Sequence, residues 1–136
     1  MIGIVVVSHS RALAHAAVGL AEGVFGSGHP PQIAVAAGLD DNTLGTDAAA
    51  VSEAIQQVDS GDGVLVFVDL GSAVLSAEMA LEFLEPDVAQ RVKITGAPII
   101  EGLVIAVVAA STGADLEKVE AEARRALEAK GKHLAD

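Results

Sequence analysis

Cysteine, tryptophan and tyrosine are all absent from this chain of 136 residues. Without cysteine there is no disulfide, no thiolate metal site and no cysteine nucleophile, which is compatible with a reducing compartment such as the cytoplasm. Only three phenylalanines supply large aromatic side chains, within a hydrophobic content of 51%. The core must therefore consist of closely packed Val, Leu, Ile and Ala side chains.

Basic side chains are also scarce. Eight Lys and Arg against 19 Asp and Glu give a net charge of −11, which repels nucleic acid and anionic lipid headgroups. The longest apolar run, 103–110, is shorter than the ~20 residues that a membrane-spanning helix needs. The N-terminus also lacks the basic region and cleavage site of a signal peptide. We expect a cytoplasmic protein that binds neither nucleic acid nor membrane.

Two continuous apolar runs, 2–7 and 64–68, predict strands that are buried on both faces of a parallel sheet. Shorter strands are predicted at 33–36 and 92–94, with helical patterns between the strands. This alternation predicts a three-layer α/β/α domain with a mostly parallel central sheet of about four strands. The length fits one domain over 1–130, followed by a frayed C-terminal tail at 131–136.

Apolar residues recur at helical spacing after the first strand, in a stripe formed by Leu13, Ala17, Leu20 and Val24. Segments 48–58 and 115–127 show similar stripes. Residues 98–112 suit a buried strand or a helix, and Pro98 at the start together with Glu101 favours the helix.

The candidate site lies where two predicted strands end. Ser8-His9-Ser10 follows the first strand, and Asp69-Leu70-Gly71-Ser72 follows the strand at 64–68. In an open parallel sheet, ligands bind beyond the carboxyl ends of the strands, beside the N-termini of helices. If the two strands are adjacent, these loops meet.

The residue types in the two loops suit phosphoryl transfer. A neutral imidazole at His9 is a nucleophile at one nitrogen when the other is held by an acceptor, and Asp69 is the natural acceptor. Gly71 would let the backbone approach phosphoryl oxygens, and Ser72 would cap the following helix and offer its hydroxyl. By position alone, a capping or hydrogen-bonded loop histidine without catalytic function is the better interpretation of His9, and the pair with Asp69 is more informative than either residue.

The other histidines and the acidic loop are weaker candidates. His15, His29 and His133 are expected at the surface. The loop at 38–47 has three carboxylates, but it lacks the alternate-residue spacing and terminal glutamate of an EF-hand, so no metal site is predicted. Gly45 would allow a tight backbone path there, and either Thr46 or Asp47 would cap the next helix.

Several enzyme motifs are missing. No Gly-x-Gly-x-x-Gly sequence follows the first strand, no Walker phosphate loop is present, and no Gly-x-Ser-x-Gly sequence makes Ser8 or Ser10 a hydrolase nucleophile. His9 also does not stand in the Arg-His-Gly sequence of histidine phosphatases. Dinucleotide binding, independent nucleotide hydrolysis and serine hydrolysis are therefore unsupported.

The chain resembles the phosphotransfer subunit of bacterial phosphoenolpyruvate-dependent dihydroxyacetone kinase, which is related to mannose-type enzyme IIA domains. The resemblance covers nearly the whole chain and depends on four stretches. These are Gly3-Ile-Val-Val-Val-Ser-His9-Ser10, Gly45-Thr46-Asp47, Val68-Asp69-Leu70-Gly71-Ser72-Ala73 and Glu78-Met79-Ala80.

The resemblance implies that His9 carries the phosphoryl group, that Asp69 orients it, and that Ser10, Gly71 and Ser72 bind the phosphate. The histidine-containing phosphocarrier protein would be the donor, and ADP on a partner kinase subunit the acceptor, so that ATP formed there phosphorylates dihydroxyacetone. No cofactor would be bound directly by this chain. A homodimer is also implied, and Arg11, Gly45 and Thr46 are candidate partner-docking residues.

Two other functions remain open at this stage. Enzyme IIA domains of mannose-type sugar transport use a similar carrier, although the Asp-Leu-Gly-Ser sequence favours dihydroxyacetone kinase. A tetrapyrrole metal chelatase also has a histidine after its first strand, and Ser8-His9-Ser10-Arg11 resembles that motif loosely. In a purely structural interaction domain, His9 would have no chemical role.

Overall fold

A four-stranded parallel sheet runs through the middle of the molecule, and the two continuous apolar runs form its inner strands. The computed structural model describes residues 1–135. The strands are β1 (Gly3–Ser8), β2 (Ile33–Ala37), β3 (Val64–Val68) and β4 (Val92–Thr95), in the order β2-β1-β3-β4. All three strand pairs are parallel. β1 and β3 are buried along their whole length, as expected for strands covered on both faces.

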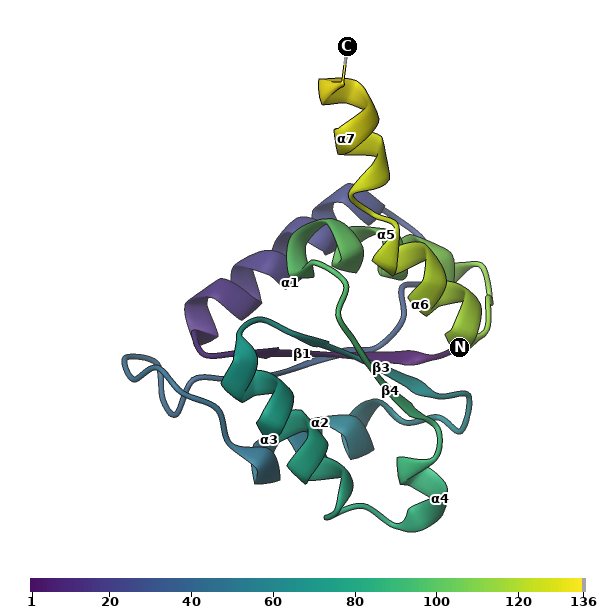
Figure 1. Ribbon diagram of the computed structural model, residues 1–136. Helices are drawn as coiled ribbons and strands as arrows, with labels where there is room; N and C mark the ends of the chain where they lie inside the picture. Colours follow the sequence, from purple (N-terminus) through teal and green to yellow (C-terminus); the bar gives the residue numbers. More distant parts are fainter. Residues whose placement is uncertain (136) are drawn as a thin grey trace.

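Helices cover both faces of the sheet (Figure 1). They are α1 (Arg11–Phe25), α2 (Ala48–Val58), α3 (Gly71–Leu81), α4 (Pro86–Ala89), α5 (Ile99–Ser111), α6 (Leu116–Arg124) and α7 (Glu128–Leu134). One apolar core lies between the sheet and α1, α5 and α6, and a second lies between the sheet and α2, α3 and α4. The predicted three-layer α/β/α architecture is confirmed.

The strand order reverses between β1 and β3. The chain passes from β1 outward to β2 on one side, and then crosses back to place β3 on the other side. Such a switch point opens a crevice at the carboxyl ends of the two strands, because their following loops diverge to opposite faces. The register pairs Val7 with Val68, so the residues that follow, Ser8 and Asp69, come next to each other at that crevice.

The buried face of α1 differs from the predicted stripe. Ala14, Ala17 and Ala21 are buried, whereas Leu13 and Leu20 are about half exposed. Alanine lets the helix axis approach β1 and α5 closely, and the larger side chains cannot fit in that narrow space. The prediction was right for Ala17 and wrong for Leu13, Leu20 and Val24, because it gave large apolar residues more weight than small ones.

The C-terminal segment also differs from expectation. Residues 128–134 form helix α7, which projects from the body of the molecule (Figure 1), so residues 131–134 of the expected frayed tail are helical. Good helix formers in this segment explain the difference, and Lys130 forms an ion pair with Glu101 of α5. Asp136 lies outside the described residues.

The ambiguous segment 98–112 is helical, as favoured. Within residues 1–135 no helix is long and apolar enough to cross a bilayer.

Candidate active site

His9 lies in the short connection between β1 and α1, at the edge of the sheet. Its backbone is held on both sides: its carbonyl oxygen accepts a hydrogen bond from Gly45 N at 2.9 Å, and its own N–H donates to Asp69 Oδ2 at 3.0 Å. The following residue, Ser10, is the N-cap of α1, because its Oγ accepts from Leu13 N at 3.1 Å. These hydrogen bonds therefore fix the backbone position from which the imidazole of His9 extends.

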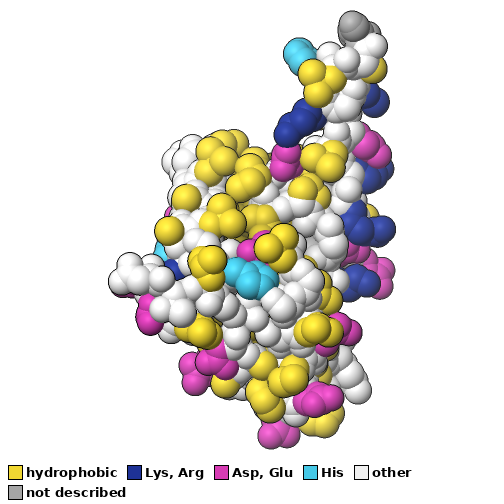
Figure 2. Space-filling model, turned by 60° about the vertical axis from the view of Figure 1, so that its left-hand side comes forward, with side chains coloured by type: hydrophobic (Ala, Val, Ile, Leu, Met, Phe, Trp, Pro, Cys, Tyr) yellow, Lys and Arg dark blue, Asp and Glu magenta, His cyan; other side chains and the backbone are white. Residues whose placement is uncertain are grey.

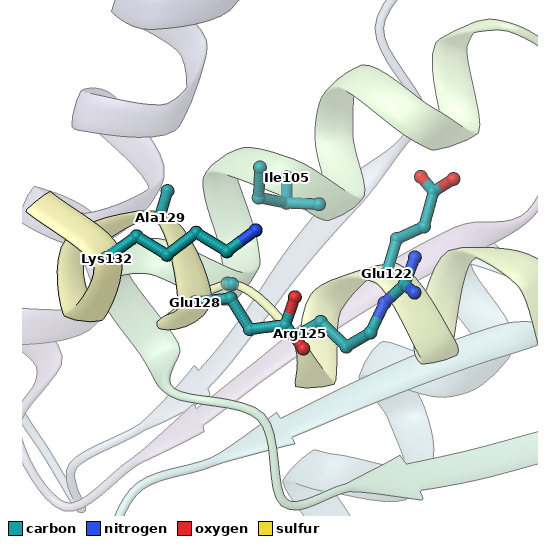
Figure 3. Close-up of a pocket in the computed structure, with 7 residues that line it drawn as sticks. Ile105, Glu122, Arg125, Glu128, Ala129 and Lys132 are labelled. Carbon is teal, nitrogen blue, oxygen red and sulfur yellow. The ribbon is translucent and has the colours of Figure 1, made fainter.

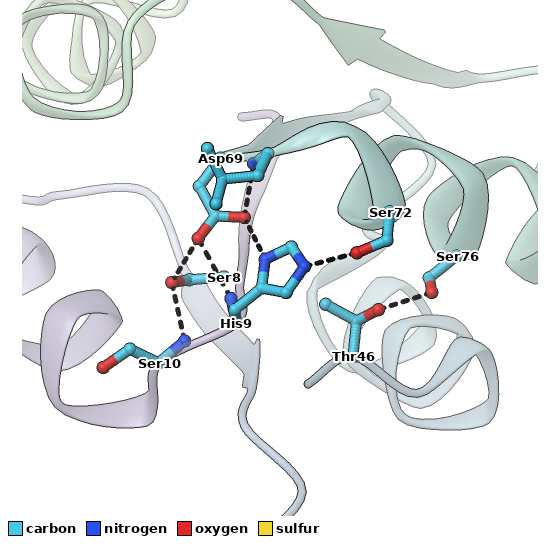
Figure 4. Close-up of polar contacts among 8 residues, drawn as sticks. Ser8, His9, Ser10, Thr46, Asp69, Ser72 and Ser76 are labelled. Carbon is cyan, nitrogen blue, oxygen red and sulfur yellow. Dashed lines mark hydrogen bonds and ion pairs between the residues drawn. The ribbon is translucent and has the colours of Figure 1, made fainter. Parts of the chain in front are cut away.

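Asp69 follows β3 and faces His9 across the switch point (Figure 4). Its Oδ1 lies 2.8 Å from His9 Nδ1 and accepts from Leu70 N at 2.6 Å. Its Oδ2 accepts from Ser8 Oγ at 2.8 Å as well as from His9 N. The predicted pair of His9 and Asp69 is thus brought together, and both carboxylate oxygens are occupied.

These contacts keep Asp69 ionised. Burial by itself would raise the pKa of the Asp69 carboxyl, but hydrogen bonds from His9 N, Leu70 N, Ser8 and the His9 ring outweigh it, and the pKa is lowered below its ordinary value. The side chains of His9 and Asp69 are 22% and 14% exposed. An ionised acceptor at Nδ1 keeps the proton on that nitrogen, because a carboxylate cannot donate.

The other ring nitrogen faces the start of α3. His9 Nε2 contacts Ser72 Oγ (Figure 4). With the proton on Nδ1, Nε2 has a free electron pair, so the Ser72 hydroxyl is the donor in this contact. The lone pair of Nε2 is therefore the nucleophilic position of the ring, and it points toward a helix N-terminus.

Ser72 does not cap α3, contrary to the prediction. The N-cap of α3 is Leu70, which has no side-chain cap, and Ser72 lies inside the first turn. In the first turn, Ala73 N donates to Leu70 O at 2.8 Å, whereas no side chain of the N-cap accepts from the N–H groups of Gly71 and Ser72. At Gly71, an added Cβ would meet nothing within 4 Å. The first turn of α3 therefore offers backbone donors and open space beside Nε2, where an anion is favoured.

The guanidinium of Arg11 is bound by the end of β2 and the loop that follows it. Arg11 Nε donates to the carbonyl oxygen of Ala37 at 3.0 Å and its guanidinium pairs with Asp41 at 3.0 Å. Both partners lie at the end of β2 and in the loop after it. Arg11 therefore anchors that loop in this structure, and its role in docking stays a prediction.

The loop between β2 and α2 borders the site on one side. Gly45 has a φ of 146°, and its N–H donates a hydrogen bond to the carbonyl oxygen of His9. The next residue, Thr46, has its Oγ1 2.6 Å from Ser76 Oγ of α3. Asp47 caps α2 by accepting from Ala49 N at 3.0 Å, which resolves the two capping alternatives. The loop is thus tied to both halves of the site.

Ser8 is the site residue that the sequence reasoning missed. It is fully buried and joins Asp69 to the Ser10 backbone N–H, which donates to Ser8 Oγ at 3.1 Å. A serine that ends an otherwise apolar buried strand, one residue before a candidate catalytic histidine, was a signal available in the sequence.

The surface has hollows, and its charged side chains are unevenly distributed. A groove between α5, α6 and α7 is lined by Ile105, Glu122, Arg125 and Lys132 among others (Figure 3), and none of its lining residues belongs to the loops after β1 and β3. Apolar side chains crowd the face shown in Figure 2, whereas Lys and Arg gather along one edge. Seven of the eight Lys and Arg residues lie after position 90. A second hollow, lined by Leu13, Asp69 and residues 96–101 among others, adjoins the site on the side of α5.

Comparison with known proteins confirms the resemblance. The family model EIIA-man, described as "PTS system fructose IIA component", matches residues 3–120. The phosphoryl donor subunit DhaM of PEP-dependent dihydroxyacetone kinase from Escherichia coli is 48% identical over 136 residues, which are 98% of this chain and 29% of that protein. The chain thus spans less than a third of that relative.

Two further relatives match over most of their own length. The corresponding subunit of kinase 2 from Listeria innocua is 37% identical over 109 residues, which are 79% of this chain and 85% of that one. A crystal structure of a protein of unknown function superposes with a TM-score of 0.77 at 32% identity, covering 92% of this chain and 95% of the other. The chain therefore belongs to the EIIA-man family of phosphotransferase system components.

Proposed function

We propose that this protein is a phosphohistidine carrier, in which His9 Nε2 receives a phosphoryl group and passes it on. The observation that carries the proposal is the placement of the imidazole between an ionised carboxylate at Nδ1 and the first turn of α3 at Nε2. The hydroxyl of Ser72 and the N–H groups of Gly71 and Ser72 are the donors for the phosphoryl oxygens, and Ser10 holds the start of α1 beside them.

The transfer requires no net change in protonation. Nε2 attacks phosphorus as the nitrogen–phosphorus bond of the donor phosphohistidine breaks, and the donor leaves as a neutral imidazole. The phosphorylated His9 ring keeps its proton on Nδ1 and is cationic, and Asp69 stabilises that charge. In the second step an oxygen of the acceptor attacks phosphorus, the bond to Nε2 breaks, and His9 returns to its neutral form. Such chemistry depends mainly on positioning and on stabilising charge.

The partners follow from the relatives. The curated relatives are named as phosphoryl donor subunits of PEP-dependent dihydroxyacetone kinase. We assign the donor role to the histidine-containing phosphocarrier protein and the acceptor role to ADP on a dihydroxyacetone kinase subunit, in the cytoplasm. A partly exposed histidine at the sheet edge suits this cycle, because one side chain must meet two proteins in turn.

A homodimer belongs to the same proposal. Leu75, Met79 and Phe83 leave large apolar areas exposed along and just beyond α3, and such areas are typical of subunit interfaces. Sedimentation equilibrium should give twice the chain mass; a single-chain mass at micromolar concentration would remove this part of the proposal.

The test is to incubate the protein with phosphoenolpyruvate, enzyme I and the phosphocarrier protein, and to look for one acid-labile phosphoryl group by mass spectrometry. The wild type should gain it and His9→Ala should not. His15→Ala is the matched control, because His15 is exposed on α1 and has no contact with the site. Phosphorylation that persists in His9→Ala would refute the proposal.

A second acceptor has support from the family description. The matching family model is described as a fructose IIA component, so a sugar transporter's next phosphotransfer domain is the alternative acceptor. Discharge of the phosphorylated protein by ADP-loaded kinase subunit, and not by that domain, would select dihydroxyacetone kinase. The chelatase alternative has no support from the family assignment.

A further inference from the structure

Ser8 and Asp69 are cross-strand neighbours on one face of the sheet. β1 and β3 pair Val6 with Phe67 and Val7 with Val68, so the next pair is Ser8 and Asp69. Because side chains alternate along a strand, Ser8 is on the same face as Val6, and Asp69 on the same face as Phe67. That common face is the one covered by α1 and α5. The fold thus buries a hydroxyl beside the carboxylate that serves His9.

The direction of each hydrogen bond at Ser8 is determined. Ser10 N–H can only donate, so Ser8 Oγ is the acceptor in that 3.1 Å contact. The single hydrogen of the Ser8 hydroxyl is then available for Asp69 Oδ2, 2.8 Å away. Ser8 has zero exposure, so no water competes for either bond. Asp69 Oδ2 is left with two donors, Ser8 and the His9 backbone, and cannot be protonated without losing one of them.

We propose that Ser8 is a positioning residue of phosphoryl transfer, whose hydroxyl holds the Asp69 carboxylate in the orientation that receives the proton of His9 Nδ1 and so leaves Nε2 nucleophilic. The role in phosphoryl transfer rests on the proposed function, whereas the effect of Ser8 on the imidazole of His9 does not. Without the hydroxyl, Oδ2 keeps only the His9 N–H, so the carboxylate loses one of the four hydrogen bonds that fix its orientation toward Nδ1.

A purely structural role for Ser8 makes different predictions. If the hydroxyl only satisfied the Ser10 N–H at the corner between β1 and α1, its removal would lower stability and leave the ring of His9 unchanged. If it acts through Asp69, its removal changes the protonation of the ring, and that change depends on the carboxylate being present. A double-mutant cycle with Asp69 separates the two roles.

The experiment compares Ser8→Ala with Ser52→Ala, which removes another buried serine hydroxyl, in α2 and away from the site. Nitrogen-15 NMR of the His9 ring, without any partner protein, gives the fraction of the Nδ1–H tautomer. Initial rates of phosphorylation are measured with the phosphocarrier protein. We expect Ser8→Ala to fold, to lower the Nδ1–H fraction at least twofold and to slow phosphorylation about tenfold, whereas Ser52→Ala matches the wild type in both.

The cycle is completed with Asp69→Asn. In that background Ser8→Ala should cause no further slowing, because the carboxylate through which it acts is gone. An unchanged tautomer in Ser8→Ala, or an equal slowing with and without the Asp69 carboxylate, would overturn the proposal. If the wild type is not phosphorylated at all, the proposed function fails, while the NMR measurement still decides whether Ser8 sets the state of the imidazole.

Discussion

Replacing Asp69 by asparagine keeps the size of the side chain but cannot satisfy its four donors. The carboxylate accepts two hydrogen bonds at each oxygen, from Leu70 N and His9 Nδ1 on one side and from Ser8 and His9 N on the other. An asparagine has one oxygen and one NH₂ group, so the NH₂ group must point at one of the two pairs of hydrogen-bond donors. With the NH₂ toward Ser8, both the Ser8 hydroxyl hydrogen and the His9 N–H would lack an acceptor, whereas with the NH₂ toward Nδ1 only the Leu70 N–H would, because the imidazole can move its proton to Nε2. We therefore expect the NH₂ to face Nδ1.

Two consequences follow for Asp69→Asn. With Nδ1 acting as acceptor, the proton moves to Nε2, which loses its nucleophilic electron pair, and phosphorylation of His9 should slow by at least ~100-fold, as expected when a catalytic histidine has the wrong tautomer. Leu70 N also loses its acceptor and the remaining bonds lose their charge, which should lower the free energy of unfolding by about 2 to 3 kcal/mol at pH 7.

The stability loss should depend on pH. The pKa of Asp69 is lowered in the folded protein, so the carboxylate stabilises the fold above its unfolded pKa of about 3.9, and this contribution is lost as pH falls through the folded value. The difference between wild type and variant in urea unfolding should therefore be largest at neutral pH and narrow below about pH 4.

A matched control is Asp115→Asn, since Asp115 caps α6 away from the site and asparagine caps equally well. It should change neither phosphorylation nor stability. If Asp69→Asn is phosphorylated at the wild-type rate, Asp69 does not set the tautomer of His9 and the reasoning fails.

Two further predictions concern the packing that supports the site. Gly3→Ala should lower the free energy of unfolding by at least about 2 kcal/mol, because the added methyl group would collide with the backbone of Val58. The control Gly19→Ala has open space around it in α1 and should be about 0.5 to 1 kcal/mol more stable than the wild type. Equal thermal unfolding of the two variants would contradict this prediction. Asp59→Asn should lower the free energy of unfolding by about 1 kcal/mol at pH 7, since the Arg91 guanidinium lowers the pKa of the Asp59 carboxyl. The loss of stability should shrink below about pH 4, where the carboxyl is protonated. A loss that does not depend on pH would argue against the ion pair.

The strands and the main site pair could be predicted from the sequence, because each depends on a strong local pattern. Runs of β-branched residues mark β1 and β3 as doubly covered strands, and parallel strands deliver their following loops to one edge. His9 and Asp69 are polar residues directly after those runs. The sequence alone therefore predicts this pair.

Other features depend on tertiary packing that a local pattern does not encode. The inner face of α1 consists of alanines because the helix lies close to the sheet, and a periodicity of large apolar residues indicates the outer face instead. The link between Arg11 and Asp41 depends on where the loop after β2 folds back. Ser72 contacts His9 instead of capping α3, because the N-cap of α3 is Leu70, two residues earlier than expected.

The central claim is that Nε2 of His9 carries the phosphoryl group while Asp69 holds Nδ1. The most direct measurement is nitrogen-15 and phosphorus-31 NMR of the phosphorylated protein, with the histidine ring labelled. We expect a coupling of phosphorus to Nε2, and an Nδ1 that still bears its proton. Phosphorus bonded to Nδ1, or to any residue other than His9, would contradict the account.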